Sequence, residues 1–156
     1  MTTGMMRLKE LTIKYSVKKD GDGRPVAVGS RVGTPRECAA AFCSVLQDEP
    51  SEVFGILCLS TKHRVIAYHE VSRGSLDSTL VHPREVFKAA ILANAAAIIL
   101  THNHPSGDPT PSPDDFALTQ RLVQAGQIIG IDVLDHVIVG DGRWISFVEL
   151  GRLASP

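Results

Sequence analysis

The sequence predicts an α/β protein with a mixed β-sheet flanked by helices, and three observations predict it. Short apolar segments with the length of strands alternate with longer segments of helical periodicity. One of the apolar segments has no polar position, as central strands do, and a Gly-Asp-Gly turn joins the last two strands. Along the chain, the expected elements follow the order strand, helix, two strands, helix, strand, helix, two strands. This order fits a layered domain. With 156 residues, 44% of them hydrophobic, the chain can bury one substantial core.

The segment 1–33 differs from the rest of the chain and is expected to form an N-terminal strand or arm. From Leu11 to Val17 apolar and polar residues alternate with the period of a half-buried strand, and KKDGDGRP after them is typical of an exposed turn. A helix is expected from about Pro35 to Gln47, because Thr34 is a suitable N-cap and Glu37 occupies the capping-box position.

A hairpin is expected after this helix. Val53 to Leu59 has the apolar content of a strand, STKH forms a short polar link, and Arg64 to Ser72 returns along the first strand. Gly74 to Leu80 is expected to be a loop. A second helix is expected to open near Pro83 and to run through VFKAAILANA.

The second half of the chain predicts a central strand, a helix and a final hairpin. Ala97 to Thr101 is fully apolar, which is typical of a strand in the middle of a sheet. Ser112 opens a third helix that continues through Ala125. Two strands, Ile131 to Val139 and Arg143 to Phe147, then flank the Gly-Asp-Gly turn.

Charge and hydropathy argue against two classes of partner. Sixteen basic and seventeen acidic residues give a net charge of −1, which predicts neither a nucleic-acid footprint nor a membrane-surface patch. No apolar segment approaches the roughly 18 residues of a membrane span, and MTTGMMRLKELTIKYS lacks the apolar core of a secretory signal. We therefore expect no membrane partner.

The three cysteines predict a reduced, cytoplasmic protein. Cys38 and Cys43 lie on the first expected helix and Cys58 lies in VFGILCL, so all three have apolar settings and none belongs to a CxxC pair. An odd number of buried thiols is typical of a compartment without disulfides. A catalytic thiol is not expected, because no histidine has an obvious partnering position.

The stretch THNHPSGDPTPSPDD, residues 101–115, carries the strongest chemical signal. His102 and His104 project to the same face if the strand extends to them, while Asn103 points the other way. Two imidazoles on one face can share a metal ion. A catalytic zinc usually has three protein ligands, and a carboxylate is the usual third when two are histidines. The nearby carboxylates are Asp108, Asp114 and Asp115.

Helix geometry favours Asp115 among these carboxylates, because the first turn of a helix is a more rigid position than the loop that carries Asp108. A structural interpretation stays open beside it. Ser112 and Asp115 also form a serviceable capping pair, and two histidines in a loop are often ordinary polar surface. Similarly, Asp135-His136 in an apolar strand indicates a buried hydrogen-bonded pair, in which His136 either supports the metal ligands or is a purely structural histidine.

Several motifs resemble one known family. The residues His102-Asn103-His104-Pro105 and Ser112-Pro113-Asp114-Asp115 look like the JAMM metalloprotease motif, H-x-H-P followed by S-x-x-D. The string HNHPSGDPTPS is similar to the RadC-like branch of the JAB/MPN superfamily. HPREVFKAAILANAAAIIL before it and VLDHVIVG after it match the same branch, so the resemblance runs from about Pro35 to Gly151. It implies a JAB1/MPN-like, cytidine-deaminase-like single domain over 34–156.

The resemblance also implies roles for individual residues. His102, His104 and Asp115 would be the zinc ligands, and Ser112 would help to hold the oxyanion of a tetrahedral intermediate. A glutamate from an earlier strand would be the general base for a zinc-bound water that cleaves a peptide or isopeptide bond. Two glutamates are candidates. Glu52 is preferred, because it opens an E-x-x-G pattern, and Glu70 in YHEVSRG is the alternative.

The chain departs from this branch in one respect, and two other function classes stay open. Members commonly carry an N-terminal helix-hairpin-helix module associated with DNA, for which the residues before Pro35 are too few, so the sequence resembles a short form. One other class is a DNA-repair-associated accessory protein, which would need a concentrated basic surface. The other is a non-catalytic interaction module that a metal stabilises.

Overall fold

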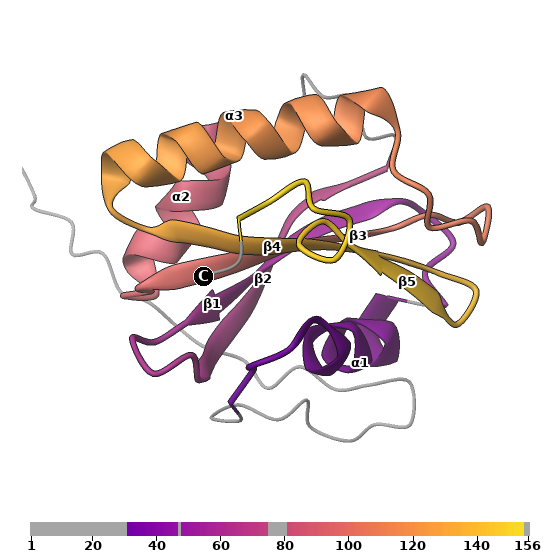
Figure 1. The fold of residues 1–156 in the computed structure, drawn as a ribbon, viewed down its shortest axis with the longest axis horizontal. Coiled ribbons are helices and arrows are strands. Elements are labelled where there is room, and N and C mark those ends of the chain that lie inside the picture. The colour runs from indigo at the N-terminus through magenta and orange to yellow at the C-terminus, as the bar shows by residue number, and fades with distance from the viewer. Residues whose placement is uncertain (1–30, 47, 75–80, 155–156) are drawn as a thin grey trace, which may run out of the picture.

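The structure is a computed structural model that describes residues 31–46, 48–74 and 81–154. Over these residues, five strands form one sheet in the order β2-β1-β3-β4-β5, with helices on both faces (Figure 1). The elements are α1 (Pro35–Leu46), β1 (Val53–Leu59), β2 (Val65–Arg73), α2 (Pro83–Leu92), β3 (Ala97–Asn103), α3 (Pro113–Ile129), β4 (Asp132–Gly140) and β5 (Arg143–Ser146). The prediction of an α/β fold with a mixed sheet is confirmed.

The sheet is mixed because only one of its neighbouring pairs is parallel. β1 pairs antiparallel with β2 and with β3, β3 pairs parallel with β4, and β4 pairs antiparallel with β5. Helix α3 makes the crossover between the two parallel strands. β3 is the middle strand, and every one of its residues is buried, as its uninterrupted apolar sequence predicts.

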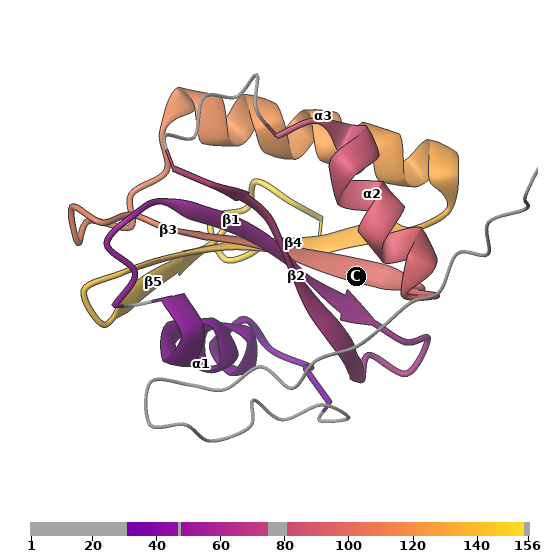
Figure 2. The same ribbon diagram turned by 180° about the vertical axis from the view of Figure 1, so that it is seen from behind.

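Two hydrophobic cores lie on opposite faces of the sheet. Helices α2 and α3 cover one face, and α1 covers the other (Figures 1 and 2). Along β1, Phe54 and Ile56 pack into the core under α2 and α3, whereas Val53 and Leu57 pack into the core over α1. This alternation follows from the two-residue period of a strand, and it decides on which face each polar residue of β3 lies.

Local signals account for where the helices begin and end. Ser112 is the N-cap of α3 rather than its first helical residue, and Gly130 ends α3 in the left-handed conformation with φ 83°. Helix α2 ends at Leu92, before the predicted end in VFKAAILANA. Asn94 adopts a positive φ of 54° there, and the N–H of Ala95 bonds to the carbonyl of Ala90, which closes the helix.

Some predictions fall outside the described residues. These are the strand from Leu11 to Val17, the KKDGDGRP turn and most of the loop from Gly74 to Leu80. Among the helices that the structure describes, none has the length and apolar character needed to cross a membrane.

Candidate metal centre

Three segments that are distant in the sequence meet at the carboxyl end of β3. Strands β1 and β3 are antiparallel with Phe54 opposite His102, so the residues just before β1 lie beside the residues just after β3. The register continued by two positions places Glu52 across from His104. Helix α3 follows β3 in the chain, and its first turn carries Asp115 over the same edge.

The side chains of these segments form one cluster of metal-binding groups. His102 Nε2 lies 2.9 Å from His104 Nε2 and 3.3 Å from Asp115 Oδ1, and His104 Nε2 lies 3.6 Å from Asp115 Oδ2. Glu52 brings a carboxylate oxygen within 4.8 Å of a ring nitrogen of each histidine. His102 is fully buried and Asp115 is 8% exposed, whereas His104 and Glu52 are half-buried. The cluster therefore opens to solvent on the side of His104 and Glu52.

The spacing of these atoms fits a small tetrahedral ion. Ligand atoms bound about 2.0–2.1 Å from a tetrahedral zinc lie roughly 3.3 Å from one another. The three distances among the atoms of His102, His104 and Asp115 are 2.9, 3.3 and 3.6 Å. Two imidazoles and one carboxylate are also a common donor set for catalytic zinc. The two histidines with Asp115, or with Glu52, are therefore close to the arrangement that such an ion requires.

Hydrogen bonding orients His104 toward the centre of the cluster. Its Nδ1 lies 2.7 Å from the backbone carbonyl of Asp108. A carbonyl oxygen can only accept, so Nδ1 carries a proton and donates it. In the neutral ring Nε2 then has a lone pair that faces His102 and Asp115.

The electrostatics of the cluster favour a positive charge at its centre. Burial disfavours the charged form of Asp115, yet the imidazoles of His102 and His104, 3.3 and 3.6 Å away, outweigh this effect and hold the pKa of the carboxyl well below its usual range. The carboxylate of Asp115, which stabilises the protonated ring, also raises the pKa of the His104 imidazole, against the opposing effect of burial. A carboxylate that stays ionised beside two imidazoles attracts a cation.

Ser112 and Asp115 form the capping pair that the sequence indicates. The Ser112 Oγ accepts a hydrogen bond from the N–H of Asp115 at 3.2 Å, and Asp115 Oδ2 accepts one from the N–H of Ser112 at 2.7 Å. The capping box and the cluster thus share one carboxylate. Ser112 itself is exposed at the rim of the cluster.

The other two aspartates that the sequence offers as ligands lie apart from the cluster. Asp108 Oδ1 accepts hydrogen bonds from the N–H and the hydroxyl of Thr110, at 3.0 and 2.7 Å, while its backbone carbonyl orients His104. Asp114 is exposed on the first turn of α3. Of the three aspartates, Asp115 is the one in contact with both histidines.

The two candidate glutamates have different surroundings. Glu70 lies on β2, opposite Gly55, where its carboxylate pairs with Arg73 at 2.8 Å. Arg73 also pairs with Glu49 at 2.6 Å. Glu52 is the one of the two glutamates that belongs to the cluster with His102 and His104.

The comparisons with known proteins show the family of this chain. The family model described as RadC-like JAB domain matches residues 32–152. This chain belongs to the RadC-like JAB domain family. The family predicted from the two motifs is confirmed.

The chain has many similar relatives, of which three illustrate the range. It is 46% identical over 150 residues to a UPF0758 protein of Pelobacter propionicus, covering 96% of this chain and 66% of the relative. It is 50% identical over 140 residues to a UPF0758 protein of Desulfitobacterium hafniense, covering 90% and 60%. It is 60% identical over 120 residues to one of Caldanaerobacter subterraneus, covering 77% and 52%. The matched region thus spans less than two thirds of these relatives.

Sequence reasoning missed two polar residues next to the cluster of this RadC-like JAB domain. The sequence predicts only that Asn103 points away from the histidines, whereas in the structure its amide holds the segment that carries Glu52. Thr119, one turn after Asp115 on α3, bonds to His136. Helical spacing would have placed Thr119 on the same face as Asp115, and this was the one signal available.

The structure also shows which contacts Asp135 and His136 make. Asp135 accepts hydrogen bonds from the backbone N–H groups of His136 and Val148 and from the hydroxyl of Ser146, at 2.7, 3.1 and 2.6 Å. The imidazole of His136 instead contacts His102, with Nε2 2.8 Å from Nδ1 of that ligand candidate. Burial lowers the pKa of His136 well below its usual value, so the ring is neutral.

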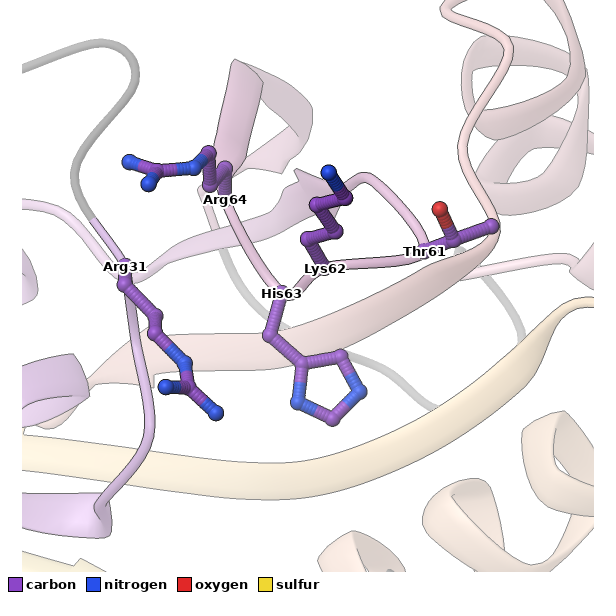
Figure 3. Close-up of a pocket in the computed structure, with 5 residues that line it drawn as sticks. All are labelled: Arg31, Thr61, Lys62, His63 and Arg64. Atoms are coloured by element: carbon purple, nitrogen blue, oxygen red, sulfur yellow. The ribbon is translucent and has the colours of Figure 1, made fainter.

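A basic pocket lies away from the cluster, at the turn between β1 and β2. It has a volume of about 370 Å³ and is lined by Arg31, Thr61, Lys62, His63 and Arg64 (Figure 3). His63 adopts a positive φ of 54° in this turn. The pocket concentrates cationic side chains in a chain whose net charge is −1.

Proposed function

We propose that this RadC-like JAB domain is a zinc-dependent hydrolase of the JAMM type, which cleaves a peptide or isopeptide bond with an activated water. One observation carries the proposal. Two imidazole nitrogens and a carboxylate that stays ionised converge within 2.9–3.6 Å of one another, and a second carboxylate stands beside them. Membership of the JAB family supports the same chemistry.

In this proposal His102, His104 and Asp115 hold the ion and Glu52 acts on the water. A bound zinc would supply a Lewis acid that lowers the pKa of water to about 7 and polarises the scissile carbonyl. Glu52 would take the proton of that water on its carboxylate and later deliver it to the leaving amine. Glu52 is suited to this role because it is half-buried at the open side of the cluster.

Ser112 would donate a hydrogen bond to the oxygen that becomes negative during the reaction. Its Oγ accepts from the N–H of Asp115, and this leaves the hydroxyl proton able to donate. A fixed donor at such a position stabilises the developing charge. Capping α3 and stabilising the oxyanion are therefore compatible roles of one side chain.

The proposal includes the partners and the compartment. The substrate would be a peptide or a protein conjugate that reaches the open side of the cluster. We place the protein in the cytoplasm, because Cys38, Cys43 and Cys58 are all free thiols. The longer relatives carry further residues, so the activity of the whole protein is part of the same proposal.

Metal analysis of the purified protein tests the ligand set. The wild type should hold about one zinc per chain, as expected for a site with three protein ligands. The double variant His102→Ala/His104→Ala should lose it, while His69→Ala, an exposed histidine on β2, should keep it. Equal zinc in the wild type and the double variant would end the proposal.

Chelation separates the enzyme from a module that metal merely stabilises. A zinc enzyme should lose peptide or isopeptide hydrolysis in the presence of a chelator and regain it with added zinc, while the folded structure persists. A metal-stabilised module should instead lose its folded structure and show no turnover before or after. Circular dichroism and hydrolysis of a quenched fluorogenic peptide library, measured on the same samples, distinguish the two.

The basic pocket favours a second candidate function, binding of nucleic acid by a DNA-repair-associated accessory protein. Three cationic side chains that line one pocket are the kind of surface that contacts phosphates (Figure 3). The test is fluorescence anisotropy with labelled single- and double-stranded oligonucleotides at two salt concentrations. Salt-sensitive binding that Arg31→Ala/Lys62→Ala weakens would support this candidate, and no salt-sensitive binding by the wild type would exclude it.

A further inference from the structure

A line of buried hydrogen bonds connects two of the proposed ligands behind the cluster. The Thr119 hydroxyl lies 2.6 Å from the backbone carbonyl of Asp115 and 2.6 Å from Nδ1 of His136. Nε2 of His136 lies 2.8 Å from Nδ1 of His102. Thr119, His136 and His102 are 2%, 0% and 0% exposed. We call this line, from the Asp115 carbonyl to the His102 ring, the Thr119–His136 network.

The direction of every hydrogen bond in the network follows from its two ends. The Asp115 carbonyl can only accept, and two oxygens 2.6 Å apart need a proton between them, so the Thr119 hydroxyl gives its single proton to this carbonyl. The Thr119 oxygen can then only accept from His136, so Nδ1 of His136 carries the proton of that neutral ring. Nε2 of His136 is left as an acceptor, and Nδ1 of His102 must donate to it.

We propose that Thr119 and His136 are positioning residues, which fix His102 as the Nδ1–H tautomer so that its Nε2 lone pair faces the cluster. In the opposite direction the Thr119 and Asp115 oxygens would lie 2.6 Å apart in a buried place with no proton between them, which is costly. His102 Nε2 is the atom 2.9 Å from His104 and 3.3 Å from Asp115. The network therefore prepares the ligand atom before any ion arrives.

Packing holds the network in place and buries it. The ring of Phe54 stacks on His102, with centroids 6.0 Å apart, and meets His136 edge-on at 5.7 Å. The ring of Phe147 lies 4.6 Å from His136. Because Thr119, His136 and His102 are almost fully buried, the Thr119 hydroxyl is the group that sets the protons of both imidazoles.

The chemical nature of the network has a consequence for the ion. Many metal-bound histidines donate to a carboxylate, which adds negative charge behind the ligand. Here the acceptor is a neutral imidazole, so the negative charge of the centre comes from Asp115 and Glu52. Two carboxylates balance a divalent cation without leaving a net charge. The effect on the ion rests on the proposed function, whereas the tautomer is a property of the metal-free protein.

The test compares three variants of matched size. Thr119→Val removes the hydroxyl and nearly keeps the shape, and Thr119→Ser keeps the hydroxyl. Thr101→Val is the control, because Thr101 is also fully buried and its hydroxyl also donates to a backbone carbonyl, that of Val137, at 2.9 Å. Long-range ¹H–¹⁵N spectra of the histidine rings in metal-free protein report the tautomer, and competition with a zinc indicator reports the dissociation constant.

The wild type, Thr119→Ser and Thr101→Val should show His102 protonated at Nδ1 and should bind zinc alike. Thr119→Val should lose the single tautomer and bind zinc about 10- to 100-fold more weakly. The inference is overturned if Thr119→Val keeps both the tautomer and the affinity of the wild type. If Thr119→Val does not fold, a wild-type spectrum with His102 protonated at Nε2 overturns it as well.

These readouts separate this inference from the proposed function. A wild type that binds no zinc, yet shows the Nδ1–H tautomer that Thr119→Val loses, would support the network and end the hydrolase proposal. A wild type that binds zinc, but whose His102 tautomer is unchanged by Thr119→Val, would overturn the network and leave the hydrolase proposal standing.

Discussion

The side-chain oxygen of Asn103 accepts a hydrogen bond from the backbone N–H of Val53 at 2.7 Å. The amide nitrogen of Asn103 donates to the carbonyls of Glu49 and Ser51, at 3.3 and 3.0 Å. One side chain thus holds the backbone on both sides of Glu52. Asn103 lies between the two histidines in the sequence but faces α1. The histidines of the cluster therefore lie on one face of β3, and the side chain that holds the segment of Glu52, which we call the Asn103 clamp, lies on the other face.

Asn103→Ala should destabilise the protein and displace Glu52. The buried N–H of Val53 would lose its acceptor, which costs about 1–3 kcal/mol of the free energy of unfolding. We expect chemical denaturation to show this loss. Zinc content should stay near that of the wild type, while kcat for peptide hydrolysis falls, since the clamp contacts the segment of Glu52 and not the histidines.

Asn103→Asp is the matched variant for this prediction. It keeps an oxygen for the N–H of Val53 but cannot donate to the carbonyls of Glu49 and Ser51, and it places a charge beside them. It should therefore be at least as destabilised as the alanine variant. If Asn103→Ala keeps both the wild-type stability and the wild-type kcat, Asn103 has no part in holding Glu52.

The elements of the fold could be predicted because their signals are local. The apolar run of β3, the capping residues of α3 and the turn between β4 and β5 are each contained in a short stretch. The histidine pair and Asp115 could be predicted for the same reason, since they lie on neighbouring elements. The family resemblance supplied the proposed role of Glu52, and the antiparallel register of β1 and β3 explains why it lies beside the histidines.

The supporting contacts could not be predicted, because they join residues that are distant in the sequence. Asn103 and Val53 are 50 positions apart, and His102 and His136 are 34 apart. Nothing in the sequence states which strand lies beside β3, and a shift of register by one residue would move every side chain to the other face. The Thr119–His136 network therefore becomes visible only once the sheet order is known.

Substitution of the two glutamates should separate their roles. Glu52→Gln should keep zinc and lose hydrolysis by about 10²–10⁴-fold, because an amide cannot accept the proton. Glu70→Gln should keep hydrolysis within a few-fold, since Glu70 is paired with Arg73. Zinc content and hydrolysis are measured on both variants. If Glu70→Gln abolishes hydrolysis while Glu52→Gln remains active, the assignment of Glu52 as the general base is wrong. If Glu52→Gln loses its zinc, Glu52 is a metal ligand.

Three substitutions of Ser112 should distinguish the cap from the oxyanion donor. Ser112→Ala should lower the free energy of unfolding by about 1 kcal/mol, because α3 loses its N-cap. Ser112→Asp keeps a capping oxygen but has no hydroxyl proton, so it should regain stability without regaining activity. Ser112→Thr keeps both. Removal of an oxyanion donor typically lowers kcat by about 10²–10³-fold. Wild-type kcat in Ser112→Asp would leave Ser112 with the capping role alone.

Gly140→Ala should displace the loop that follows β3. A Cβ at Gly140 would lie 2.9 Å from the backbone carbon and oxygen of Gly107, closer than real Cβ atoms approach. Gly107 donates its N–H to the carbonyl of His104 at 2.9 Å, so a displaced loop would move a proposed ligand. We expect weaker zinc binding and a loss of about 1–3 kcal/mol in the free energy of unfolding.

In the control Gly33→Ala the atom nearest to the added Cβ would be 3.6 Å away, so the free energy of unfolding and the zinc affinity should be unchanged. Unchanged zinc affinity in Gly140→Ala would show that the loop tolerates the shift.

The thiols should be unreactive in the folded protein, and their reactivity should depend on pH. Burial raises the pKa of Cys58 to about 11 and that of Cys38 to about 12, and it also raises the pKa of Cys43. At pH 8 a thiol with a pKa near 11 is ionised in about one molecule in a thousand, and only the thiolate reacts. An aromatic disulfide reagent should therefore modify Cys38 and Cys58 far more slowly in native than in denatured protein, with rates that rise about tenfold per pH unit up to the pKa.

Ionisation of these thiols also couples to folding. Their pKa values in the folded protein lie above those of an unfolded chain, so their contribution to stability is present at neutral pH and is lost as the pH rises toward about 11 and 12. A thiol reagent at pH 8 should accordingly leave peptide hydrolysis intact, whereas a chelator should abolish it. Rapid inactivation by one equivalent of the thiol reagent at pH 8 would contradict this prediction, because it would require an ionised cysteine at the reacting bond.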